Sequence, residues 1–246
     1  MAKLKKWQFV GLLLLVALLW AVIDILERLQ DGPTEAGHAE VVWVDAKTRC
    51  SAVRIADTIL LTADTAHCQL EEKNAVKDDK GGFAALETLI GNNAAAGVSI
   101  WKMKLDPTAP AGMSVWPDAS AVSAGTTMRL VGYGRPPSSA GVRKAAVGAL
   151  TAACSPTDGC SQQPAWTANI LLGRACGHDS GGGLFTTDRS GSAKLAGLHI
   201  GPAPNAGLDR ECCVDKTRFV LLDLTLEKWI CDQLKAAGIS HAACEL

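Results

Sequence analysis

The feature that most limits the fold of this chain is a series of short apolar stretches rich in β-branched residues. Each is too short for most helices, and together they lie at residues 41–44, 53–62, 98–105, 128–133, 142–150 and 195–200. Turn-forming residues separate them at 81–82, 91–93, 136–137 and 181–183. Many short strands with turns between them predict an all-β barrel or sandwich.

Two further segments complete this domain, which we place at residues 40–246. Residues 106–127 are rich in Pro, Ala, Gly and Ser and suit a crossover between two halves of the β body. Near the C-terminus, Asp223 can cap a helix that would end at Gly238. Apolar residues recur there at spacings of three and four, which predicts an amphipathic helix: Leu226, Trp229, Ile230 and Leu234.

The N-terminal segment differs from the rest of the chain. Residues 9–23 carry no charge, and Lys3, Lys5 and Lys6 precede them. This pattern fits a membrane anchor or a signal peptide. The absence of a clear small-residue cleavage site after Ile23 favours an uncleaved transmembrane helix over 1–30, followed by a linker at 31–39. A cleaved signal peptide and a buried core helix are the alternatives. The flanking lysines then place residues 31–246 outside the cytoplasm, in a periplasmic or extracellular position.

Charge and cysteine content narrow the function. The chain has 24 basic and 25 acidic residues, with no basic patch, which excludes a nucleic-acid binder that relies on phosphate contacts. Its nine cysteines lack the CxxC pairs of zinc ribbons, so disulfides in an oxidising compartment are expected. Two disulfides between cysteines that are close in the sequence are possible, Cys154–Cys160 and Cys231–Cys244. We expect no cofactor and no metal, because His67, His178 and His199 match no zinc-ligand spacing.

Two segments carry residues suited to catalysis. Residues 176–184 read Cys-Gly-His-Asp-Ser-Gly-Gly-Gly-Leu, and a serine between glycines can expose its hydroxyl among backbone N–H groups. Residues 60–68 read Leu-Leu-Thr-Ala-Asp-Thr-Ala-His-Cys, in which a histidine follows an apolar strand. Taken separately, the first also fits a plain surface turn and the second a structural histidine.

Together the two segments resemble the trypsin/chymotrypsin-like serine protease family. That family's motifs read roughly LTAAHC and GDSGGP, and this chain has LTADTAHC and GHDSGGGL. Further segments resemble strands of the family and its terminal helix, in the family's order: residues 131–134, 195–201, 217–220 and 229–230. The resemblance covers about residues 40–235 and implies two β-barrels with a C-terminal helix, in addition to the N-terminal transmembrane helix.

The resemblance assigns roles to individual residues. Ser180 would be the nucleophile and His67 the general base, while the N–H groups of His178 and Ser180 would form the oxyanion hole. Cys50 and Cys68 match the disulfide that brackets the histidine. Cys176 matches the cysteine beside the specificity pocket, with Cys212 or Cys213 as its partner.

The third member of the catalytic triad departs from the family pattern. Ser99 stands where the family has an aspartate that orients the histidine, and a serine carries no charge. Asp64 and Asp106 are the two candidate carboxylates that could take its place. His199 stands where the family commonly has a serine. A hydrogen bond between Ser99 and His199 could hold His67 by a neutral relay, or both changes could be drift after a loss of catalysis.

Other departures concern the cleft and activation. His178 replaces a glycine, which either obstructs the oxyanion site or supplies a side-chain donor there. Arg174 and Gly201 match the substrate pocket, and an arginine there would favour an acidic side chain. Asp179 matches the buried aspartate that pairs with a new N-terminus after zymogen cleavage. No activation sequence of that kind appears near residue 40, so either Asp179 has another partner or the domain folds directly into its final form.

These observations predict a membrane-anchored, extracytoplasmic serine endopeptidase that acts on a protein or peptide through Ser180 and His67. Its acidic triad position would be occupied by Ser99. The alternative is a catalytically inactive pseudoprotease that serves as a protein-binding module.

Overall fold

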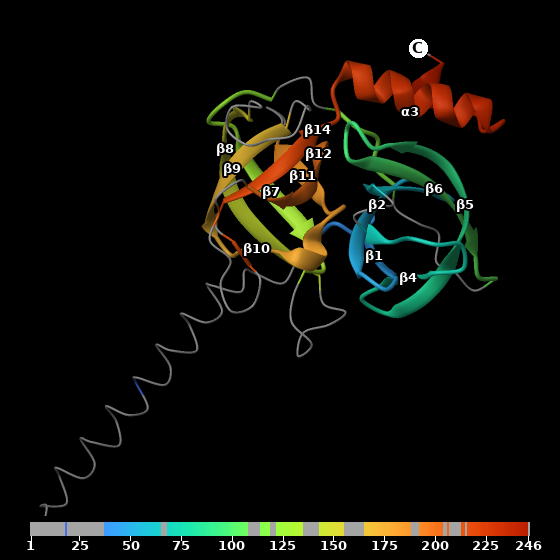
Figure 1. Cartoon of the computed structure of the whole chain (residues 1–246), viewed down its shortest axis with the longest axis horizontal. Coiled ribbons are helices and arrows are strands. Elements are labelled where there is room, and N and C mark those ends of the chain that lie inside the picture. Colours follow the sequence, from blue (N-terminus) through green and yellow to red (C-terminus); the bar gives the residue numbers. More distant parts are fainter. Residues whose placement is uncertain are drawn as a thin grey trace, which may run out of the picture.

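Two closed β-barrels lie side by side, and one helix packs above the barrel made from the first half of the domain (Figure 1). The computed structural model describes residue 18 and residues 37–64, 68–107, 114–118, 122–134, 143–154, 165–187, 192–203, 206, 213–214 and 216–245. The predicted all-β architecture of two barrels with a C-terminal helix is confirmed. The transmembrane helix expected at 1–30 lies outside the described residues except for residue 18. Among the residues that are described, no helix is long and apolar enough to span a membrane.

The first barrel has six antiparallel strands in the order β1-β2-β3-β6-β5-β4. They are β1 (Val41–Asp45), β2 (Cys50–Ala56), β3 (Ile59–Ala63), β4 (Ala75–Asp78), β5 (Gly81–Asn93) and β6 (Val98–Leu105). Side chains such as Leu60, Leu86 and Met103 fill its interior.

The second barrel has six strands in the order β11-β12-β14-β9-β8-β7. They are β7 (Thr127–Gly132), β8 (Lys144–Cys154), β9 (Ala165–Leu172), β11 (Gly183–Thr187), β12 (Ala193–Pro202) and β14 (Lys216–Leu221). Two short strands, β10 (Ala175–Cys176) and β13 (Cys213–Val214), pair with each other in a separate sheet. The 3-10 helix η3 (Gly177–Asp179) directly follows β10 in the chain. Leu130, Leu184 and Phe219 are part of the interior of this barrel.

The predicted strand pattern is wrong at three points. The stretch 53–62 is two strands, β2 and β3, joined by a turn at residues 57–58. The glycines at 81–82 and the residues 91–93 are not separators but belong to β5. The register of β5 against β6 shifts between Leu89 and Gly91, and a glycine is tolerated in a strand at such a bulge.

The crossover between β6 and β7 is hydrogen-bonded to both barrels. Between β6 and β7, Val115 N–H donates to Arg54 C=O of the first barrel (3.0 Å), and Asp118 N–H donates to Leu195 C=O of the second (2.8 Å).

Helix α3 (Leu224–Ala236) starts at the Asp223 carboxylate, which accepts from Leu226 N–H. It buries Leu226, Ile230 and Leu234, as the spacing predicts.

The helix ends at the predicted glycine. Gly238 has a φ of 70°, and its N–H donates to Lys235 C=O at 3.0 Å. Ile239 N–H then reaches back to Leu234 C=O at 2.9 Å, which completes a Schellman motif. The predicted disulfide between Cys231 and Cys244 ties the 3-10 helix η4 (Ala242–Cys244) to α3.

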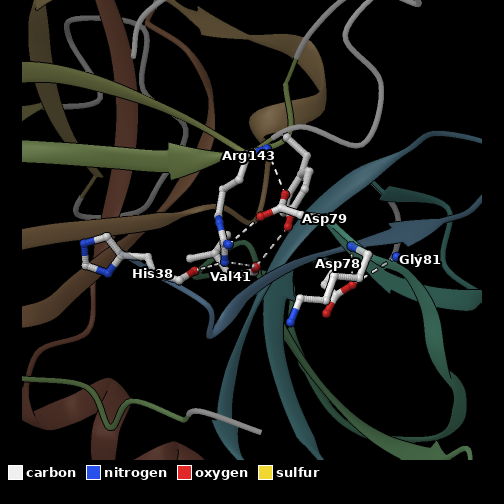
Figure 2. Close-up of polar contacts among 8 residues, drawn as sticks. His38, Val41, Asp78, Asp79, Gly81 and Arg143 are labelled. Atoms are coloured by element: carbon white, nitrogen blue, oxygen red, sulfur yellow. Dashed lines mark hydrogen bonds and ion pairs between the residues drawn. The ribbon is translucent and has the colours of Figure 1, made fainter. Parts of the chain in front are cut away.

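A buried arginine connects the start of the first barrel to the second. Arg143, just before β8, donates to the carbonyls of His38 and Val41 and pairs with the Asp79 carboxylate at 2.5 Å (Figure 2). The ring of His38 stacks on Phe185 of β11 at 3.9 Å. The residues that lead into β1 are therefore anchored on the second barrel.

Candidate active site

The loop that carries Ser180 is held by both barrels. From the first barrel, Ser51 N–H donates to Ser180 C=O at 2.9 Å, and Ser51 Oγ donates to His178 C=O at 3.1 Å. From the second, Gly181 N–H donates to His199 C=O at 2.8 Å. The candidate nucleophile therefore lies at the junction of the barrels, where both fix the backbone around it.

Asp179 is buried under this loop and has found partners other than a new N-terminus. Its carboxylate accepts from Gly134 N–H at 2.7 Å and from Cys176 N–H at 2.8 Å. Burial raises the pKa of Asp179 to about 7, and the two hydrogen bonds act in the opposite direction. The backbone amides of β10 and of the segment after β7 thus take the place that a zymogen-derived N-terminus would have.

Close approach explains the glycines of this region. A Cβ on Gly134 would lie 2.2 Å from Asp179 Cγ, and one on Gly132 would lie 2.3 Å from Asp179 Oδ1. Gly181 has a φ of 84°, and a Cβ there would lie 2.1 Å from Ser51 C=O. Only glycine lets the loop pack this closely on the first barrel.

We call the Ser180 loop closed, because the Ser180 side chain is buried and its backbone N–H is directed into the loop. Ser180 is 1% exposed. A 3-10 helix is held by i→i+3 hydrogen bonds, so η3 directs Ser180 N–H toward Gly177 C=O. Gly182 N–H donates to Asp179 C=O at 2.7 Å, which fixes the turn after Ser180.

His67 lies outside the described residues, but the elements around it are described. The predicted disulfide between Cys50 and Cys68 is present, with a Cα–Cα distance of 5.8 Å. Strand β3 ends at Ala63, and its residue Thr62 pairs with Ser99 of β6. The segment that carries His67 therefore starts beside Ser99, as the resemblance implies.

Ser99 is fully buried and donates to Ala63 C=O at 2.8 Å. The His199 Nε2 is bonded to Thr217 Oγ1. Thr217 donates its only proton to Gly201 C=O at 2.8 Å, so His199 Nε2 is the donor in that pair. In these contacts Ser99 and His199 have different partners, and the relay through His67 stays a prediction, because His67 lies outside the described residues.

The two replacement carboxylates lie at opposite ends of β6. Asp64 directly follows Ala63, the hydrogen-bond partner of Ser99. Asp106 follows the far end of the strand, seven residues from Ser99, which corresponds to about 23 Å along an extended chain. Of the two, only Asp64 is near Ser99.

His178 is exposed at the surface of the loop. Burial of part of the ring lowers the pKa of His178, and the positive charge of Arg49 lowers it further. Arg49 itself is stacked on Trp43 at 4.2 Å. The His178 side chain therefore does not fill the interior of the loop and favours its neutral form.

The predicted pocket residues are placed as follows. Arg174 lies partly buried between β9 and β10, and Gly201 lies in β12 with a φ of 132°. Cys176 is disulfide-bonded. Of its two predicted partners, Cys212 lies outside the described residues, and Cys213 is the neighbour of Cys176 in the β10–β13 pair. Cys160, the predicted partner of Cys154, also lies outside the described residues. Sequence reasoning gave no functional role to Ser51 or Arg218, because Ser51 lies outside the quoted motifs and the segment 217–220 was interpreted only as a strand. Within the described ranges, no three His, Cys, Asp or Glu side chains are grouped as a metal site requires.

Comparison with solved structures agrees with this geometry: the chain has the two-barrel fold of trypsin-like serine proteases. The inactive form of the Rv3671c protease from M. tuberculosis H37Rv matches with a TM-score of 0.55 and 17% identity, over 82% of this chain and 91% of that one. The HtrA-type protease AlgW with a tripeptide matches with a TM-score of 0.59 and 15% identity. That match covers 82% of this chain and 62% of AlgW, so this chain spans less than two thirds of AlgW. No family model and no curated protein matches the sequence.

Proposed function

We propose that this protein is a serine endopeptidase that hydrolyses peptide bonds through Ser180 and His67. The observation that carries the proposal is the position of Ser180, on a glycine-rich loop that both barrels fix at their junction. The segment with His67 begins at the end of β3, beside Ser99. Two of the solved proteins with this fold are named as proteases, and one of them, AlgW, holds a tripeptide.

In the proposed reaction, Ser180 Oγ attacks the carbonyl carbon of the scissile bond, and His67 takes the hydroxyl proton. His67 then gives this proton to the leaving amine, and water hydrolyses the acyl-enzyme. The N–H groups of His178 and Ser180 would stabilise the oxyanion once the Ser180 loop leaves its closed conformation. Ser99 occupies the acidic triad position without a charge, so a low turnover is expected.

The proposed setting is extracytoplasmic, with the domain attached to a membrane through residues 1–30. The lysines before the apolar stretch 9–23 support this orientation. The disulfides Cys50–Cys68 and Cys231–Cys244 fit an oxidising compartment.

The second candidate is a pseudoprotease that binds a protein without cleaving it. Two observations favour it: Ser180 is almost fully buried, and η3 directs its amide into the loop. A binding module has no need to expose either group.

Labelling of the full chain with a fluorophosphonate probe separates the two candidates. The protease should be labelled, and labelling should vanish in the Ser180→Ala variant and fall sharply in His67→Ala. The Cys50–Cys68 disulfide and a cooperative unfolding transition serve as checks that each sample is oxidised and folded. Folded, oxidised protein that no probe concentration labels would refute the protease and leave the binding module.

A further inference from the structure

Arg218 is a partly buried arginine in the wall of the second barrel. It lies in β14, opposite Gly201 of β12. Its guanidinium makes no hydrogen bond or ion pair with the rest of the described chain, and its Nε atom is buried without an acceptor. Buried polar groups nearly always have a partner, so the Nε atom of Arg218 is an exception that needs an explanation.

The guanidinium lies beside the strand next to the Ser180 loop. Thr217 and Phe219 are both fully buried, so strand alternation directs Arg218 to the outer face of the barrel. Its Nη2 atom is 3.8 Å from the point that a Cβ on Gly201 would occupy. Gly201 is two residues after His199, whose C=O accepts the Gly181 N–H of the loop.

The positive charge of Arg218 has no negative partner among the described residues. Burial lowers the pKa of Arg218, and no carboxylate in the described part of the chain opposes that effect. A guanidinium that is partly removed from water and unpaired is unfavourable, whereas its planar donors match a carboxylate in a bidentate pair. Arg174, the cation expected in the pocket, already has a partner in the structure. Of these two arginines, Arg218 is therefore the one that is available to a ligand.

We propose that Arg218 binds the side-chain carboxylate of a glutamate or aspartate in the peptide that occupies the cleft. This rests on the proposed function: a peptide whose scissile bond faces Ser180 would lie close to β12, because His199 C=O of β12 accepts the Gly181 N–H of the Ser180 loop and Gly201 of β12 is paired with Arg218. Glycine at position 201 leaves space for the peptide side chain to reach the guanidinium.

Binding can be tested without catalysis. The probe is a set of fluorescein-labelled tetrapeptide pools in which one position is fixed as Glu, Gln or Lys and the others are mixed. Anisotropy is measured with the full chain carrying Ser180→Ala. At one position the Glu pool should bind at least 10-fold more tightly than the Gln pool. Adding Arg218→Gln should remove this ratio, Arg218→Lys should retain part of it, and Arg218→Glu should favour the Lys pool.

Lys216→Gln is the matched control, because Lys216 is an exposed cation two residues away on the same strand. It should leave the Glu-to-Gln ratio unchanged. Equal binding of the Glu and Gln pools at every position, or a ratio that Arg218→Gln does not alter, would overturn the inference. Loss of the ratio in Lys216→Gln as well would also overturn it, because the effect would then be general charge.

A second readout covers folding and separates this inference from the protease proposal. Removing an unpaired cation should leave the Tm of Arg218→Gln at or above that of the parent, and a clear fall would contradict the absence of a structural partner. If fluorophosphonate fails to label Ser180 but the Glu preference depends on Arg218, the protease proposal fails and this inference stands. If fluorophosphonate labels Ser180 but the protein shows no Glu preference, this inference fails and the protease proposal stands.

Discussion

Ser51 donates a backbone hydrogen bond to the carbonyl of Ser180 at 2.9 Å, and the two residues lie 129 positions apart in the sequence. The hydroxyl of Ser51 also donates to His178 C=O and accepts from Tyr133 N–H at 2.9 Å. One buried side chain of the first barrel thus joins the second barrel to the nucleophile loop. Its removal has consequences both for stability and for the order of that loop.

Ser51→Ala should slow fluorophosphonate labelling of Ser180 about 10-fold and lower the free energy of unfolding by about 1–3 kcal/mol. Two buried backbone groups, His178 C=O and Tyr133 N–H, would lose their partner. Ser51→Thr, which keeps the hydroxyl, should recover part of the rate. Thr167→Ala removes a buried hydroxyl that bonds to Thr151 in β8, so it should lower stability without slowing labelling. Labelling of Ser51→Ala at the parental rate would rule out a positioning role.

Asp179 should make the protein less stable as the pH rises from about 4 to about 7. Its pKa is raised from 3.8 to about 7, so in this window the folded state holds a proton that the unfolded state has released. The contribution is fully present below the unfolded value and is lost through the folded value, with a slope of about 1.4 kcal/mol per pH unit. Urea unfolding at pH 4, 5.5 and 7 should show a smaller decline in Asp179→Asn. Identical pH slopes in the two proteins would contradict the assignment.

Gly134→Ala should destabilise the protein by about 1–3 kcal/mol or more, because the new methyl group would overlap the Asp179 carboxylate. The same overlap should displace the Ser180 loop and slow labelling. Gly82→Ala is the matched control, since the nearest atom to its Cβ is 3.8 Å away. The test is urea denaturation of both variants beside the parent, and equal effects of the two substitutions would refute the close approach.

Ser99→Asp should raise peptide hydrolysis by about 10²-fold or more, because the charge would orient His67 and stabilise its protonated form. Loss of this charge in a complete triad costs roughly 10⁴-fold in turnover. Ser99→Asn supplies hydrogen-bonding groups without a charge and should give little gain. Steady-state hydrolysis of a fluorogenic peptide measures all three proteins. If folded Ser99→Asp is no faster than Ser99→Asn, the protein is not an enzyme that lacks only its third member.

Arg49→Gln should raise the pKa of His178, because the positive charge of Arg49 contributes to lowering it. The effect is measured by following the imidazole resonances of His178 in NMR spectra between pH 4 and pH 8. Lys47→Gln, a change of the same charge two residues earlier, should leave the titration of His178 nearly unaltered. A larger shift in the Lys47 variant would show that Arg49 is not the nearby cation.

The elements predicted most closely are those whose signal is local. Strand β6 was expected at 98–105 and is found at Val98–Leu105. The Asp223 cap and the Gly238 end of α3 follow from side-chain chemistry within one helical turn. Strand β5 was missed because its glycines signal turns locally, while its pairing with β4 and β6 makes it a bulged strand. Pairing between distant segments overrides such local signals.

The sequence by itself determined the class of fold and the motifs around Ser180 and His67, since these depend on residue types at short spacings. The disulfide between Cys50 and Cys68 followed from the family resemblance. Only the tertiary structure decided the partners of Asp179, the closed state of η3, the separation of Asp106 from Ser99 and the lack of a partner for Arg218 Nε among the described residues. Each of these depends on which strands become neighbours in the closed barrels. Burial and hydrogen bonding arise from contacts between distant segments, which no local pattern specifies.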